Sequence, residues 1–155
     1  MQDIINQIHK LLLKKQKTIA IAESCTGGLT AEMLTRLAGS SRYFILSIVA
    51  YNNSAKIRIL HIPAAIIRQK GAVSKEVALM LAKSVRKLAQ TDFGIGITGI
   101  AGPTGATKEK PVGTVFISVS AENKNRCQKF NFKGGRLKIR KSAALKSLKL
   151  LKTCL

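Results

Sequence analysis

Three turn segments carry residue types suited to anion binding and nucleophilic chemistry. They are residues 23–28 (Glu-Ser-Cys-Thr-Gly-Gly), residues 38–41 (Ala-Gly-Ser-Ser) and the Gly- and Pro-containing residues 98–112. Backbone N–H groups and hydroxyls in such turns bind phosphate. Each turn alone is a weak signal, because Gly-rich turns end strands in many proteins. The first and third, however, follow predicted strands, and ligands bind at that edge of open α/β sheets.

Among the possible nucleophiles, the sequence favours a serine activated by a lysine. The only histidines are His9, on a basic N-terminal segment, and His61, beside a proline, so a Ser-His-Asp triad is not expected. Cys25 lies in a promising turn but has no evident histidine partner, and we interpret it as a small packing residue. A desolvated lysine, by contrast, keeps a neutral fraction near neutral pH and can activate a serine.

The elements that would position these residues alternate between helix and strand. The apolar periodicity predicts helices at residues 3–16, 29–37, 74–90 and 137–151, with short helices ending near residues 60 and 70. Residues 52–54 (Asn-Asn-Ser) are expected to cap the first short helix, and Ser74 the helix at 74–90. Strands are expected at residues 18–22, 43–51, 93–97, 113–120 and 126–132. The apolar run at 43–51 predicts a strand buried on both faces. We therefore expect one domain over residues 1–155, with an α/β fold: a three-layer α/β/α sandwich with a mixed sheet.

Composition restricts the class of protein. The formal net charge of +20 would attract polyanions, but the lysines are spread along the chain and aromatics make up only 5%, so we expect at most nonspecific nucleic-acid binding. The sequence shows no membrane-spanning segment or signal peptide. Its three scattered cysteines suit a reducing cytoplasm, and no metal-ligand cluster or cofactor fingerprint is present.

Six sequence blocks in order resemble the CinA C-terminal domain family. They are residues 22–28 (AESCTGG), 38–41 (AGSS), 51–56 (YNNSAK), 71–74 (GAVS), 98–103 (TGIAGP) and 110–115 (KPVGTV). The resemblance extends from about residue 4 to about residue 150, and six blocks are far more specific than one motif. The chain resembles the stand-alone form of the family, and we therefore expect no N-terminal domain before this region. It departs from the family pattern at residues 45–48, Ala106 and Gly135.

The resemblance implies an activity and a set of site residues. Family members deamidate nicotinamide mononucleotide to nicotinate mononucleotide and ammonia, a step of pyridine nucleotide salvage, with a catalytic serine, tyrosine and lysine. On matching positions these are Ser41, Tyr51 and Lys56, with Ser41 as the nucleophile. The resemblance assigns substrate binding to Glu23, Ser24, Thr26, Gly27, Gly28, Ser40, Thr98, Gly99, Gly102 and Arg136. No cofactor or metal is implied, and a homodimer is expected.

Two other functions stay open. One is a regulatory or nucleic-acid-associated module that keeps the fold and has a weakened reaction. The other is an amidohydrolase that acts on a different small amide.

Overall fold

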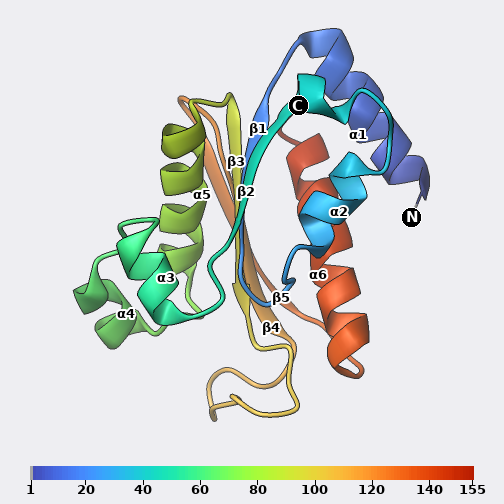
Figure 1. The fold of residues 1–155 in the computed structure, drawn as a ribbon. Coiled ribbons are helices and arrows are strands. Elements are labelled where there is room, and N and C mark those ends of the chain that lie inside the picture. The colour runs from blue at the N-terminus through green and yellow to red at the C-terminus, as the bar shows by residue number, and fades with distance from the viewer. Residues whose placement is uncertain (1) are drawn as a thin grey trace.

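A five-stranded mixed sheet forms the centre of the computed structural model, which describes residues 2–155 (Figure 1). The strands are β1 (Ile19–Glu23), β2 (Phe44–Val49), β3 (Phe93–Gly99), β4 (Thr114–Ser120) and β5 (Asn125–Asn131), in the spatial order β2-β1-β3-β4-β5. β1 pairs in parallel with both β2 and β3, whereas β3–β4 and β4–β5 are antiparallel. The carboxyl ends of β1, β2 and β3 therefore lie at the same end of the sheet, at the bottom of Figure 1.

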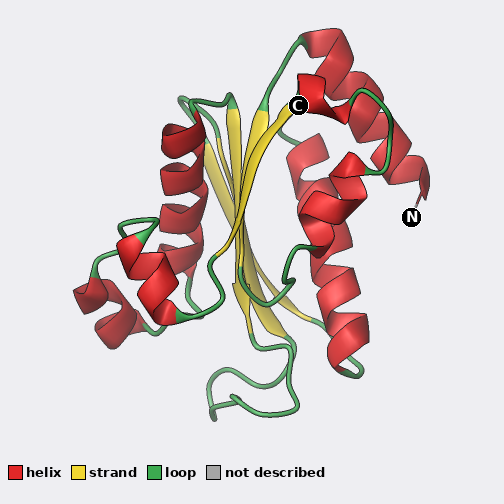
Figure 2. Cartoon of the chain, in the orientation of Figure 1, coloured by secondary structure: helices red, strands yellow, loops and turns green. Residues whose placement is uncertain are grey.

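Helices cover both faces of this sheet (Figure 2). On one face lie α1 (Gln2–Lys15), α2 (Leu29–Thr35) and α6 (Arg136–Lys152), and on the other lie α3 (Asn53–Arg58), α4 (Ala64–Lys70) and α5 (Lys75–Ala89). A short 3-10 helix, η1 (Ser40–Arg42), precedes β2. This is the predicted three-layer α/β/α sandwich.

Each layer of helices buries its own apolar cluster against the sheet. The larger cluster includes Ile8, Leu12, Ile21, Ile117 and Leu148 and joins α1, α2 and α6 to the strands. The smaller one joins α3, α4 and α5 to the other face through residues such as Leu60, Val77, Leu81 and Val85. On β1 the alternating side chains thus point into two separate cores, Ile19 and Ile21 into the larger and Ala20 and Ala22 into the smaller.

α5 lies unusually close to β3 because two strand residues lack side chains. A Cβ built on Gly94 would lie 2.1 Å from the Ala82 carbonyl oxygen, and one on Gly96 would lie 2.3 Å from the Ala78 carbonyl oxygen. Both distances are far below van der Waals contact, so only glycine permits this approach of helix and strand.

Two predicted helix starts are confirmed by side-chain caps, but the predicted burial of β2 is wrong. Asn52 accepts a hydrogen bond from the Ser54 amide at the start of α3, and Ser74 accepts one from the Val77 amide at the start of α5. β2 is an edge strand, and Ile45 remains 50% exposed. Its apolar run resembles a central strand, but its outer backbone edge has no neighbouring strand.

Candidate active site

Ser24 and Lys56 meet where the parallel strands end. Ser24 directly follows β1, and Lys56 lies in α3, the helix that follows β2. The Lys56 Nζ donates to Ser24 Oγ at 3.2 Å, to the Ala50 carbonyl oxygen at 2.8 Å and to the Tyr51 carbonyl oxygen at 3.2 Å. The Asn52 cap sets the start of α3 and so fixes the lysine relative to the end of β2.

Burial changes the acid–base properties of Lys56. Its side chain is among the largest fully buried ones, at 1% exposure. Desolvation lowers the pKa of Lys56 from its ordinary value of 10.5. A neutral amine has two N–H donors and one lone pair. It can therefore donate to the two carbonyls while accepting the proton of Ser24, the arrangement required of a general base.

Glu23 has a structural role that the sequence-based assignment to substrate binding missed. Its buried carboxylate accepts hydrogen bonds from the amides of Gly28, Thr30 and Ala31 at 2.9–3.1 Å. These amides lie at the start of α2, where N–H groups have no hydrogen-bond partner within the helix, so the carboxylate caps the helix and complements its dipole. The expected anion site at this helix start is thus occupied by the protein's own carboxylate.

The turn between β1 and α2 is held from α6 by Arg140, a residue that sequence reasoning did not identify. Its guanidinium donates to the carbonyl oxygens of Cys25 and Thr26 at 3.1 and 2.9 Å. A Cβ on Gly27 would lie 2.8 Å from this guanidinium, and Gly27 has a φ of +60°. Only the position of Arg140 opposite the turn reveals this role, because nothing in its sequence context marks it.

Cys25 and Thr26, beside Ser24, are buried. Burial raises the pKa of Cys25 to about 12, so the thiol stays protonated, in agreement with its interpretation as a packing residue. Thr26 is fully buried, and its hydroxyl has no partner within residues 2–155. Ser24, at 8% exposure, is the hydroxyl of this turn that contacts a candidate base.

Tyr51 and Arg136 form a polar bridge at the same edge of the sheet. Arg136, the first residue of α6, donates one hydrogen bond to the Tyr51 hydroxyl and another to the Gly102 carbonyl oxygen at 2.7 Å. Tyr51 is 54% exposed and Arg136 is also exposed. The structure therefore brings together Ser24, Tyr51, Lys56, Gly102 and Arg136 of the predicted set.

Thr98 and Gly99 belong to β3 and make structural contacts. The buried Thr98 hydroxyl donates to the Ala72 carbonyl oxygen at 2.8 Å and so ties the strand to the segment before α5. A Cβ on Gly99 would lie 2.6 Å from the Val115 side chain, so this glycine permits close pairing with β4. Their predicted contact with a ligand remains a prediction.

Ser40 and Ser41 lie at the opposite end of β2 from Lys56. They form η1, before the first residue of β2, whereas Lys56 contacts carbonyls beyond its last residue. Six extended residues span roughly 20 Å. The predicted pairing of Ser41 with Lys56 therefore does not occur within one chain. The strand predicted at residues 43–51 already placed Ser41 before it and Lys56 after it, but the pairing taken from the family motifs did not account for the length of this strand.

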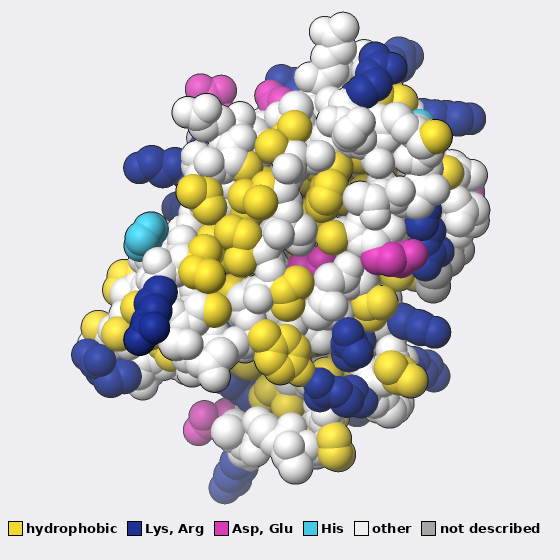
Figure 3. Space-filling view, in the orientation of Figure 1, with side chains coloured by type: hydrophobic (Ala, Val, Ile, Leu, Met, Phe, Trp, Pro, Cys, Tyr) yellow, Lys and Arg dark blue, Asp and Glu magenta, His cyan; other side chains and the backbone are white. Residues whose placement is uncertain are grey.

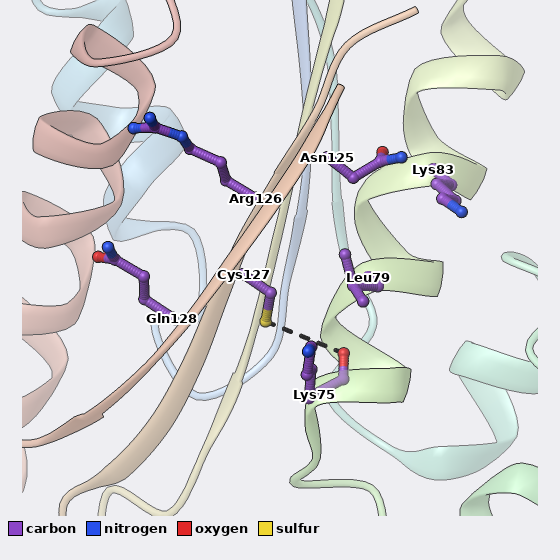
Figure 4. A pocket seen from close by; sticks show the side chains of 7 residues that line it. All are labelled: Lys75, Leu79, Lys83, Asn125, Arg126, Cys127 and Gln128. Carbon is purple, nitrogen blue, oxygen red and sulfur yellow. Dashed lines mark hydrogen bonds between the residues drawn. The ribbon is translucent and has the colours of Figure 1, made fainter. Parts of the chain in front are cut away.

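The hollow drawn in Figure 4 lies away from these residues. It lies beside α5 and β5, has a volume of about 530 Å³, and is lined by residues including Lys75, Lys83 and Cys127. Burial raises the pKa of Cys127 to about 11, so this thiol is not a ready nucleophile. Within residues 2–155, no three His, Cys, Asp or Glu side chains gather as metal ligands would.

The fold is that of an α/β protein, a mixed sheet between two helical layers, and its candidate active site is a buried Ser–Lys pair at the carboxyl ends of the parallel strands. The sequence model of the CinA C-terminal domain family matches residues 1–155. The chain belongs to this family.

Relatives and solved structures agree with this membership. A CinA-like protein from Desulfotalea psychrophila is 45% identical over 97% of this chain and 37% of its own length. One from Geotalea daltonii is 44% identical over 92% of this chain and 34% of its own length, so the chain spans about a third of these relatives.

Two crystal structures share the fold. The competence/damage inducible protein CihA from Agrobacterium tumefaciens has a TM-score of 0.95 at 33% identity, covering 98% of this chain and 93% of that one. A CinA superfamily protein from Escherichia coli has a TM-score of 0.95 at 27% identity, covering 99% and 90%.

No helix within residues 2–155 combines the length and the apolar character needed to cross a bilayer.

Proposed function

We propose that this chain is an amidohydrolase that deamidates nicotinamide mononucleotide, with Ser24 as nucleophile and Lys56 as general base. The observation that carries the mechanism is the 3.2 Å contact between Ser24 Oγ and the buried Lys56 Nζ. The amide class and the nucleotide come from the family resemblance. The nucleophile departs from the sequence-based assignment to Ser41, because Ser24 is the serine within reach of the base.

The proposed reaction is acyl transfer in two steps. Neutral Lys56 takes the Ser24 proton as Oγ attacks the carboxamide carbon, and the resulting ammonium donates that proton to the departing ammonia. The C–N bond breaks and a nicotinoyl ester on Ser24 remains. Water then attacks the ester with Lys56 again as base, which releases the acid and restores the serine.

The polar bridge of Tyr51 and Arg136 would serve the charged part of the substrate. A guanidinium binds phosphate through paired N–H donors, and Arg136 retains an exposed position beside the Tyr51 hydroxyl. In this proposal Tyr51 orients Arg136 and also contacts the substrate. The proton relay rests on Lys56 alone. Lys56 Nζ contacts the carbonyl oxygen of Tyr51, whereas the Tyr51 hydroxyl contacts Arg136.

The test is incubation of the purified protein with nicotinamide mononucleotide and a panel of related amides, with ammonia and the acid product measured. We expect deamidation of the nucleotide, loss of nearly all turnover in Ser24→Ala, and release of ammonia in the single-turnover acylation step only when Ser24 is present. Ser41→Ala is the matched control, since it removes an equivalent hydroxyl at the other end of β2.

The possible results separate the alternatives. Turnover of another amide with the same Ser24 dependence keeps the mechanism and changes the substrate. Full activity in Ser24→Ala contradicts the assigned nucleophile. No turnover of any amide, despite correct folding, favours the regulatory alternative.

A further inference from the structure

A groove lies at the end of the sheet opposite the candidate active site. It consists of two adjoining hollows of about 560 and 320 Å³, both bordered by the end of α5, the segment before β3 and the turn between β4 and β5. The two hollows share the lining residues Arg86, Gln90, Thr91, Ala121 and Glu122. β3 begins at this groove with Phe93, whereas Ser24 and Lys56 lie beyond the last residues of β1 and β2. The length of the sheet therefore separates the two sites (Figure 1).

Three positive side chains on one face of α5 border this groove. Lys83 is followed by Arg86 after three residues and by Lys87 after four, the spacing that places side chains next to one another along a helix. Like charges at this spacing repel one another. The ion pairs within residues 2–155 involve none of the three. This face therefore carries three positive charges that no ion pair of the described chain neutralises.

Arg86 is held against the sheet and has an unused hydrogen-bond donor. A Cβ built on Gly94 of β3 would lie 2.7 Å from the Arg86 Cβ, so the base of this side chain rests on the strand. The Arg86 Nε is buried and has no hydrogen-bond partner within residues 2–155. A buried donor without an acceptor costs free energy, and in native proteins such a group usually has a protein, water or ion partner. A ligand with several oxygen atoms in the groove would bring acceptors to this guanidinium.

The two acidic residues of the groove differ in how far their charge is balanced. The Asp92 carboxylate accepts hydrogen bonds from Lys17 Nζ at 2.7 Å and from the Thr18 amide and hydroxyl, both at 2.9 Å. Glu122 is exposed and belongs to neither ion pair of residues 2–155. With Lys17 and Asp92 paired, the three positive charges on α5 and the single negative charge of Glu122 leave the groove with a net charge of +2.

We propose that this groove binds a polyphosphate anion, with Lys83, Arg86 and Lys87 as the groups that contact its phosphates. The guanidinium offers paired N–H donors to phosphate oxygens, and the two ammonium groups act as point charges. The larger hollow lies within the range of roughly 300–1,000 Å³ that is typical of small-ligand sites, so several linked phosphates fit. This inference does not depend on the proposed function.

The side chains of the groove favour a phosphate chain over a nucleic-acid strand. Proteins that bind single strands stack the bases on exposed aromatic side chains. Among the described residues that line the two hollows, Phe93 is the one aromatic, and it is only 7% exposed. The phosphates are therefore the group that the groove recognises.

Positive side chains are not confined to this groove. Figure 3 shows Lys and Arg side chains spread over much of one face of the molecule. With a net charge of +20, the whole chain attracts anions. The test must therefore compare variants that remove the same charge from different places.

The first test is calorimetric titration with sodium tripolyphosphate at a fixed, moderate salt concentration. We expect one anion per wild-type chain and a loss of about 10- to 100-fold in affinity for Lys83→Gln/Lys87→Gln, the scale of lost charge-assisted hydrogen bonds. The control is Lys138→Gln/Lys141→Gln, which removes the same charge from exposed positions on α6, over the other face of the sheet, and should bind as the wild type does. Equal weakening of the two double variants, or several equivalent sites per chain, would overturn the proposal.

Two single variants should change the affinity in opposite directions, which a loss of folding cannot do. Glu122→Gln removes the negative charge of the groove and should tighten tripolyphosphate binding. Glu109→Gln is its control, because it removes the same charge from an exposed residue of the loop before β4 and should have no effect. Arg86→Lys keeps the positive charge but loses the paired donors, so its affinity should fall. Unchanged or weaker binding in Glu122→Gln would contradict the assigned groove.

Two further measurements separate this groove from other phosphate sites. Arg136→Gln alters the candidate active site and should leave tripolyphosphate binding unchanged. Loss of binding in Arg136→Gln with retention in Lys83→Gln/Lys87→Gln would place the anion at the candidate active site and overturn the proposal. ATP then tests the source of the phosphates. An affinity no greater than that of tripolyphosphate supports recognition of the phosphate chain alone, and a tighter one supports recognition of a nucleotide, each with the same dependence on Lys83 and Lys87.

Discussion

Lys56 lies in a buried environment that disfavours the charged form of its side chain. It is buried, and its three hydrogen-bond partners are a hydroxyl and two carbonyls, with no carboxylate among them. A buried lysine without an anionic partner releases its proton more readily than a free lysine. Burial destabilises the ammonium form of Lys56 and therefore favours the neutral amine, which can act as a general base.

Activity should depend on pH through this residue. Because the pKa of Lys56 is lowered, its neutral fraction grows as pH rises, and the rate should climb with pH and level off above the folded-state pKa. Lys56→Met should lose on the order of 10²–10⁴-fold in kcat, the usual effect of removing a positioned acid–base group, and should lose this pH dependence. Pre-steady-state rates over a pH series measure both. A wild-type profile that is flat or falls with pH would contradict the assignment.

Stability should follow the same titration. Between the lowered folded-state pKa and 10.5 the unfolded chain binds more protons at this residue than the folded chain. The contribution of Lys56 to the free energy of unfolding must then rise with pH across that window and be least favourable below it. Urea unfolding of wild type and Lys56→Met at several pH values gives this contribution as a difference. A difference that is independent of pH would show that the pKa is not shifted.

Glu23 should matter for folding more than its proximity to the nucleophile suggests. Glu23→Gln replaces one acceptor oxygen with an N–H₂ group that faces the amide donors of α2, and we expect a loss of about 1–3 kcal/mol in the free energy of unfolding. Glu32→Gln is the control, because its partner Arg36 and Glu32 itself are exposed, where ion pairs contribute little. Equal effects of the two variants in urea unfolding would contradict the capping role.

At the level of the elements, much of the architecture was predictable from local pattern. The period of apolar residues indicated the helices and strands, and Asn52 and Ser74 marked helix starts that the structure confirms. Strand order was not predictable, because β2 has the composition of a central strand and its place at the edge depends on tertiary packing. The assignment of Ser41 failed for a different reason: Ser41 precedes β2 and Lys56 follows it, and the pairing taken from the family motifs did not account for the length of the strand between them.

The contact between α5 and β3 should not tolerate a side chain. In Gly96→Ala the added Cβ would meet the Ala78 carbonyl oxygen at 2.3 Å and the Ala82 nitrogen at 2.5 Å, so the helix must move. We expect a loss of about 1–3 kcal/mol or more, typical of overpacking. Gly135→Ala is the control, since it has open space around it and an ordinary φ of −72°. Thermal unfolding that is unchanged in Gly96→Ala would show that the layers can separate at little cost.

At the level of the whole molecule, positive charge dominates the surface. Against 27 Lys and Arg there are seven Asp and Glu, and ion pairs within residues 2–155 are confined to Lys17–Asp92 and Arg36–Glu32. Most of the positive side chains therefore lack an acidic partner in the chain. Such a molecule repels itself and attracts polyanions, whatever its activity.

This charge predicts two salt effects. Added sodium chloride should raise the melting temperature by screening self-repulsion. Binding to duplex DNA should be weak and independent of sequence, and should fall steeply as salt rises. Differential scanning fluorimetry and fluorescence anisotropy across a salt series measure the two effects. Binding to one DNA sequence that persists at physiological salt would favour a regulatory function.

Because Glu23 caps α2, backbone amides at the start of this helix respond to movements of the active-site turn. The carboxylate that holds the amides of Gly28, Thr30 and Ala31 belongs to the residue directly before Ser24. Any local opening that displaces Ser24 from Lys56 by moving this turn must also release those three amides to solvent. Their hydrogen-exchange rates therefore set an upper limit on how often the nucleophile leaves its base, and they do so in the absence of substrate.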